Sequence, residues 1–75
     1  MENNKTIKEN FDFAFENHKK NNLEVAEKIY KEILKEDPNH FPSIVLLGTL
    51  SAQTKNFDLA KQLLEKGIKI NPDHP

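Results

Sequence analysis

Histidines, carboxylates and lysines are the residues of this sequence whose side chains could do chemistry. The three histidines, His18, His40 and His74, stand far apart, and there is no cysteine. A zinc site needs ligands at short helical or turn spacings, such as His-x-x-x-His or Cys-x-x-Cys, so that they converge on one ion. No such pair occurs, and we therefore expect no metal site.

A catalytic or phosphate-binding arrangement is also missing from the pattern. The two glycines, Gly48 and Gly67, both fall inside helical patterns, so no glycine-rich loop is available to cradle a phosphate. No serine, histidine and acid stand in an arrangement that suggests a nucleophile, a base and a group that orients it. We expect no catalytic residue, no cofactor and no enzymatic activity from these residues.

Charge and hydropathy exclude further classes. All 11 basic side chains are lysine and the net charge is −1, which disfavours nucleic-acid recognition because arginine forks carry much of its specificity. No segment approaches the roughly 20 apolar residues of a membrane helix, and the amino end lacks the apolar core of a signal peptide. We expect a cytoplasmic protein of one small domain with neither nucleic-acid nor membrane partners.

An internal repeat organises the chain. Pro38 and Pro72 are 72 − 38 = 34 residues apart. The same offset relates four further pairs: Ala26 with Ala60, Tyr30 with Leu64, Leu34 with Ile68, and His40 with His74. Low complexity alone would not place alanine, a large side chain and proline at fixed distances, so two structural units are indicated.

Apolar residues at three- and four-residue steps predict four helices. Asn22 and Asn56 stand where two of these helices would have their N-caps, and Pro38 and Pro72 end them. The predicted apolar stripes are Ile7, Phe11, Ala14, Phe15 and His18; Leu23, Ala26, Ile29, Tyr30, Ile33 and Leu34; Ile44, Leu47, Gly48 and 50–52; and Phe57, Ala60, Leu63, Leu64 and Ile68.

The 34-residue period, with "LLGTLSAQTKNFDLAKQLLEKGIKINP" in its second unit, resembles the tetratricopeptide repeat. Leu47 and Gly48 match the family's leucine-glycine pair, and Ala26 and Ala60 match its small residue in the second helix of each repeat. The resemblance implies an all-α fold of two antiparallel helix-turn-helix hairpins, a four-helix fragment of a right-handed α-solenoid. The expected boundaries are a leader at 1–6, repeat 1 at 7–40 and repeat 2 at 41–74.

Departures from the family pattern are also informative. Asn10 and Asn17 occupy positions that usually carry large aromatic residues in the first repeat, which suggests a polar outer side, as in an amino-terminal capping unit. Gly67 stands where the family usually has alanine. We expect either an unusually close neighbour at Gly67 or a local weak point, and favour the close neighbour.

The resemblance also implies a binding surface, because the first helix of each repeat lines the concave face in this family. A strip that includes Phe11 and Phe15 would accept apolar side chains of an extended peptide or a partner helix. The alternative is that further repeats or a second copy cover it. The candidate partner-binding residues are Lys8, Phe11, Asp12, Phe15, Val45, Leu46, Thr49 and Gln53, with His18, Lys19 and Ala52 beside them.

One family subtype can be argued against. Its members clamp the terminal carboxylate of a peptide with lysine and asparagine side chains, and the matching positions here are Phe11, Phe15 and Leu46. These side chains offer a carboxylate no hydrogen-bond donor.

The expected function is therefore a protein-interaction scaffold that binds a protein or peptide. Two alternatives stay open. The chain could form a homo-oligomer through its uncapped terminal repeat, where Leu59, Leu63 and Ile70 would keep apolar surface exposed. It could also be the leading repeats of a larger enzyme, such as an O-glycosyltransferase or a sulfotransferase.

Overall fold

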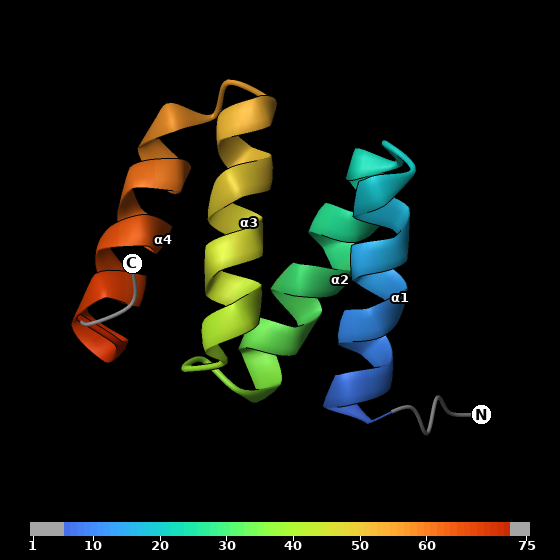
Figure 1. Ribbon diagram of the computed structural model, residues 1–75, viewed down its shortest axis with the longest axis horizontal. Coiled ribbons are helices and arrows are strands. Elements are labelled where there is room, and N and C mark those ends of the chain that lie inside the picture. The colour runs from blue at the N-terminus through green and yellow to red at the C-terminus, as the bar shows by residue number, and fades with distance from the viewer. Residues whose placement is uncertain (1–5, 73–75) are drawn as a thin grey trace.

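Four α-helices make up the fold in the computed structural model, which describes residues 6–72 (Figure 1). The helices are α1 (Ile7–Lys19), α2 (Leu23–Glu36), α3 (Phe41–Gln53) and α4 (Phe57–Ile70). The all-α prediction of two helical hairpins is confirmed. The expected leader, apart from Thr6, and His74 lie outside the described residues.

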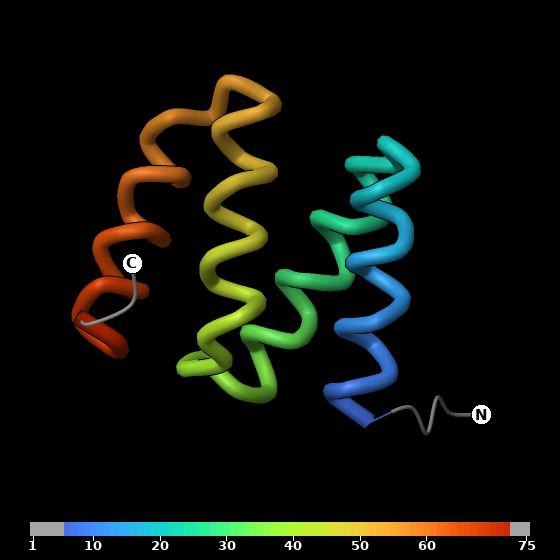
Figure 2. Tube along the Cα trace, in the orientation of Figure 1, coloured from blue at the N-terminus to red at the C-terminus, as the bar shows by residue number. Residues whose placement is uncertain are grey.

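The helices contact one another in chain order. Helix α1 packs on α2, α2 on α3, and α3 on α4, and the trace shows α1 and α4 at the two ends of the row (Figure 2). Each hairpin is closed by a short turn, which forces its two helices to run antiparallel. Helix α2 therefore has a neighbour on two sides, whereas α4 packs mainly against α3.

Both hairpin turns have the same backbone geometry. Asn21 (φ 69°) and Lys55 (φ 66°) adopt the left-handed conformation, and the next residue in each turn donates its N–H back across the end of the helix: Asn22 N to Asn17 O at 2.8 Å, and Asn56 N to Ser51 O at 2.8 Å. This is the Schellman arrangement, which satisfies carbonyls that the helix end leaves unpaired.

The predicted N-cap residues stand at the expected positions, but their side chains do not cap the helices. Asn22 and Asn56 precede α2 and α4, yet neither side chain makes a capping hydrogen bond. Asn22 instead donates through Nδ2 to Asn17 Oδ1 at 3.2 Å. Helix α1 has the cap with the fullest bonding: the Thr6 side chain accepts from Glu9 N at 3.1 Å, and Glu9 Oε1 accepts from Thr6 N at 2.9 Å, which is a capping box.

The core lies where α1, α2 and α3 meet. Its buried cluster comprises Ala14, Ala26, Tyr30, Leu47 and Leu50. The small alanines let the helix pairs approach closely, and the large Tyr30 fills the space beside them. Tyr30 and Ala26 therefore play the packing roles that the repeat pattern predicts.

The two glycines have different surroundings. A methyl group added to Gly48 would lie 3.0 Å from Leu64 Cδ2 and 3.1 Å from its Cγ, so α3 and α4 do require a small residue there. A methyl group at Gly67 would lie 3.6 Å from both Ile44 and Phe41, which is ordinary van der Waals contact. This spacing does not support the preferred prediction of an unusually close neighbour at Gly67, and the alternative, a local weak point, stays a prediction.

The predicted apolar stripe of α4 is only partly covered. Ala60 is buried and Leu63 packs against the core. Phe57 is 65% exposed, Leu64 40% and Ile68 63%. Phe57 and Ile68 are largely open to solvent, whereas Leu64 also packs against α3 at Gly48. Of the residues expected to keep apolar surface exposed, Leu59 and Leu63 are half-buried and Ile70 is exposed.

We expect Gly67→Ala to stabilise the fold by about 0.5–1 kcal/mol, because alanine has the higher helix propensity and its methyl group fits. Gly48→Ala gains the same helix propensity, but its methyl group displaces the Leu64 side chain. We therefore expect it to lower the free energy of unfolding. In a Leu64→Ala background that conflict disappears, so Gly48→Ala should then stabilise. Urea unfolding of the four variants measures this, and equal effects at both glycines would contradict it.

Lys55→Gly should raise the free energy of unfolding by about 0.5–1 kcal/mol, since glycine adopts the left-handed conformation without a Cβ conflict. Asn21→Gly is the matched control at the equivalent turn position. It should gain less, because asparagine already tolerates that conformation. Thermal unfolding compares the two, and a larger gain at Asn21 would count against the argument.

Candidate partner-binding face

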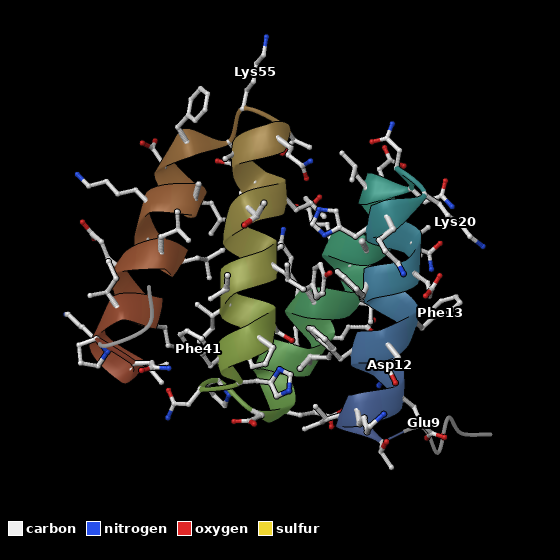
Figure 3. All side chains as sticks on the ribbon, in the orientation of Figure 1. Glu9, Asp12, Phe13, Lys20, Phe41 and Lys55 are labelled. Atoms are coloured by element: carbon white, nitrogen blue, oxygen red, sulfur yellow. The ribbon has the colours of Figure 1, made fainter. Side chains whose placement is uncertain are left out.

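Helices α1 and α3 carry the residues expected to bind a partner, and the His18–Gln53 contact joins the two helices beside them. We call this surface the α1/α3 face and define it by Lys8, Asp12, Phe15 and Lys19 on α1 and by Leu46, Thr49 and Gln53 on α3. Asp12 lies on the near side of α1 in Figure 3, whereas Phe13 points away from α3.

Two stacked phenylalanines form the apolar part of this face. The ring centroids of Phe11 and Phe15 are 6.3 Å apart and their planes differ by 4°. Phe11 is half-buried, with its ring 6.0 Å from that of Tyr30 and 5.6 Å from that of His40. Phe15 is 38% exposed. Phe11 therefore belongs mainly to the core, and Phe15 is the aromatic side chain offered to solvent.

Charged groups surround the Phe15 ring. Lys19 Nζ lies 5.0 Å from the ring centroid, in cation–π range, and 3.1 Å from Glu16 Oε2. Nearer the start of α1, Lys8 Nζ is paired with Asp12 Oδ2 at 3.0 Å. Both ion pairs are well exposed, so they contribute little to the stability of the fold.

His18 links three helices beside this surface. Its Nε2 is 2.7 Å from Gln53 Oε1 on α3, and its Nδ1 is 3.2 Å from the Tyr30 hydroxyl on α2. Since an amide oxygen can only accept, the hydrogen belongs on Nε2, and in the neutral ring Nδ1 accepts from the tyrosine hydroxyl. The chain Tyr30–His18–Gln53 thereby ties the first hairpin to the second.

The residues of α3 divide between two roles. Val45 is half-buried, and its Cγ2 would lie 3.8 Å from a methyl group at Gly67, so it contributes to the contact of α3 with α4. Leu46 packs against the core from the side. Thr49 is exposed and donates its hydroxyl to Val45 O at 3.0 Å. The structure thus leaves Phe15, Thr49 and Gln53 exposed, keeps Leu46 half-buried against the core, and turns Val45 toward α4.

Two other kinds of site find no support in the described chain. Within residues 6–72, no three His, Cys, Asp or Glu side chains gather closely enough to hold a metal ion. None of the four helices described here has the length and apolar character needed to cross a membrane.

Stacked hairpins that contact only their neighbours in sequence, with one face of side chains left to solvent, define an α-helical repeat protein. The chain belongs to the tetratricopeptide repeat family, whose model matches residues 18–75. It is a protein-interaction repeat module, and the repeat itself is not catalytic.

Comparison with curated proteins gives a match to a large enzyme. Over 66 residues the chain is 32% identical to the UDP-N-acetylglucosamine–peptide N-acetylglucosaminyltransferase of Caenorhabditis elegans. The match covers 88% of this chain but 6% of the relative, so the chain spans a small part of that protein's length. No solved structure gives a significant match.

Sequence reasoning missed two contacts of the histidines. It placed His18 beside the surface but not in a bond with Gln53, which is 35 residues away. It assigned His40 to a repeated turn, whereas its Nδ1 is 2.7 Å from Ser43 Oγ at the start of α3. The His40–Ser43 contact had a signal in the sequence, since a polar side chain three residues into a helix is within reach of the residue before the helix. The His18–Gln53 contact had no such signal.

Burial raises the pKa of the Tyr30 hydroxyl to about 12. The unfolded chain has the ordinary value near 10, so the stability linked to this hydroxyl is complete below pH 10 and is lost as the pH rises toward 12. We expect the wild type to lose roughly 1–2 kcal/mol more over this range than Tyr30→Phe, which cannot ionise there. Urea midpoints at several pH values measure this. Parallel losses in both proteins would show that Tyr30 does not cause the effect.

Proposed function

We propose that the α1/α3 face binds an extended peptide or a helix of a partner protein. The observation that carries the proposal is the placement of Phe15, a large aromatic side chain that is 38% exposed yet held by stacking on the half-buried Phe11. A ring held in one orientation loses little side-chain entropy on binding, so it is suited to anchor an apolar side chain of a ligand.

The polar groups around Phe15 suggest what such a ligand would look like. Lys19 and the Lys8–Asp12 pair lie along α1, and Gln53 and Thr49 lie along α3. A ligand with an apolar residue over Phe15 and polar or acidic groups near Lys19 would satisfy both kinds of surface. A free terminal carboxylate is not favoured as the anchor, because Phe15 and Leu46 stand where clamp donors would be needed.

The match to a glycosyltransferase supports the module rather than an activity. It covers 6% of that enzyme, and the described residues offer no metal-binding cluster. In a longer protein of that kind, these hairpins would act by binding. We therefore propose a binding role with no catalytic step carried out by this chain.

Phe15→Ala should weaken binding of peptides selected by display on the wild-type protein by about 10-fold or more, as truncation of an aromatic anchor typically does. Phe13→Ala is the matched control. It removes the same side chain from the same helix, and Phe13 is 48% exposed on the side that points away from α3. Calorimetric titration of both variants gives the ratio.

Equal effects of Phe13→Ala and Phe15→Ala would rule out the α1/α3 face as the binding surface. Phe11→Ala is not a useful probe, because Phe11 packs on Tyr30 and the core and its loss would also destabilise the fold.

A further inference from the structure

The hydroxyl of Tyr30 has a single hydrogen-bond partner within residues 6–72. Tyr30 is fully buried, and its hydroxyl oxygen lies 3.2 Å from Nδ1 of His18. A buried hydroxyl that does not donate its hydrogen loses a bond to water without replacing it, which is costly. The hydroxyl hydrogen therefore points to Nδ1, and Nδ1 is the imidazole nitrogen that carries no hydrogen.

The direction of this bond determines the direction of the next one, on the other side of the imidazole. When Nδ1 of a neutral imidazole accepts, Nε2 carries the hydrogen and can only donate. Its partner, 2.7 Å away, is Oε1 of Gln53. The oxygen and the amino group of an amide lie on different sides of its carbon, so this bond turns the amino group of Gln53 away from His18. A core residue of α2 thus sets the orientation of a side chain on the surface of α3.

The reverse arrangement of the same three side chains is less favourable. It would put the imidazole hydrogen on Nδ1, and Gln53 would then turn its amino group toward Nε2 of His18. The Tyr30 hydroxyl would accept from Nδ1 and would need another acceptor for its own hydrogen. No second acceptor for it is present in the part of the chain that the structure describes. Since such networks distinguish the oxygen from the nitrogen of a glutamine amide, the buried hydroxyl decides the assignment.

The amino group of Gln53 is open to a ligand on the α1/α3 face. Gln53 is exposed, and among the described residues none accepts a hydrogen bond from its Nε2. His18, which holds the amide, follows Phe15 by three residues, about one helical turn. Helix α3 itself carries no charged side chain that would compete for a polar group of the ligand. Gln53 is therefore an oriented hydrogen-bond donor beside the aromatic side chain proposed as the anchor.

We propose that Gln53 selects ligands that present a carbonyl oxygen beside the residue packed on Phe15. Tyr30 and His18 are positioning residues, because they hold the amide so that it donates to the ligand and does not accept from it. A ligand with a donor at this point would face a second donor, which lowers its affinity relative to one with a carbonyl. The inference rests on the proposed function and adds to it the chemical group that the face recognises.

Nitrogen NMR of the imidazole rings tests the positioning without a ligand. We expect the neutral ring of His18 in the wild type to be mainly the Nε2–H tautomer. In Tyr30→Phe the share of the Nδ1–H tautomer should rise about twofold or more, because no hydroxyl then holds Nδ1 as an acceptor. His40 is the internal control, since its Nδ1 contacts Ser43 rather than Tyr30, and its tautomer should not change.

Gln53→Glu separates the donor from the bond between the hairpins. A glutamate oxygen still accepts from His18 Nε2, so that bond remains, but a second oxygen replaces the amino group. Calorimetric titration with peptides selected by display on the wild type should show about 10-fold weaker binding. Gln62→Glu is the matched control. It makes the same change of charge at an exposed position of α4 and should leave binding unchanged.

Changes in the peptide identify the carbonyl that Gln53 binds. Replacing one amide bond by an ester weakens a main-chain carbonyl as an acceptor, and replacing asparagine or glutamine by alanine removes a side-chain carbonyl. The effects of two changes at one contact are not additive. The peptide change that weakens binding to the wild type but not to Gln53→Glu therefore marks the bonded oxygen, and it shows whether the main chain or a side chain supplies it.

Several results would overturn the proposal. A wild-type His18 with its hydrogen on Nδ1 would reverse the amide of Gln53, and an unchanged tautomer in Tyr30→Phe would remove the role of Tyr30. Equal binding by the wild type and Gln53→Glu would exclude the selection, yet a loss of affinity in Phe15→Ala would leave the proposed function intact. Equal effects of Phe13→Ala and Phe15→Ala would overturn the proposed function and the selection together, while the tautomer measurement would still decide the positioning.

Discussion

The burial of Tyr30 is the interaction on which the rest of the structure depends. Its ring is fully enclosed, with Phe11 and His18 of α1 on one side and the core residues of α3 on the other. A single side chain of α2 thus joins the packing within the first hairpin to the packing between the hairpins. Hairpins in a repeat protein contact only their neighbours, so stability depends heavily on such shared residues.

The contrast between Tyr30 and Leu64 explains the different ends of the molecule. Both occupy the same place in the repeat, yet Tyr30 is covered by α3 and Leu64 is 40% exposed. At the other end, Asn10 of α1 stands where α3 has the buried Ile44, but Phe13, which is 48% exposed, stands where α3 has the core residue Leu47. Both ends of the row therefore carry exposed apolar side chains, and they differ in the polar residues beside them.

Features that depend on spacing could be predicted, and features that depend on the exact distance between helices could not. The proline and alanine periodicity predicted the hairpins, and the same residues correctly placed Ala26 and Tyr30 in the core. The preference at Gly67 failed because the sequence does not show how close the neighbouring helix is. A methyl group added at Gly48 would lie 3.0 Å from the nearest side-chain atom, and one added at Gly67 would lie 3.6 Å from the nearest one. The candidate surface stays a prediction, since only the family resemblance put Phe15 and Gln53 on one face. The structure shows that Phe11 and Val45 are half-buried, and periodicity does not resolve that difference.

The His18–Gln53 bond connects the stability of the fold with binding. Gln53 belongs to the second hairpin and His18 to the first, and their bond lies beside the surface proposed for a ligand. A ligand that spans Phe15 on α1 and Thr49 on α3 would bridge the same junction that this bond and Tyr30 hold together. The stability of a repeat protein is roughly the sum of the stabilities of its repeats and of the contacts between neighbouring repeats. A ligand that bridges the two hairpins would therefore stabilise the contact between them directly. Binding energy at this face is then also folding energy, which is why a chain with so small a core can benefit from a partner.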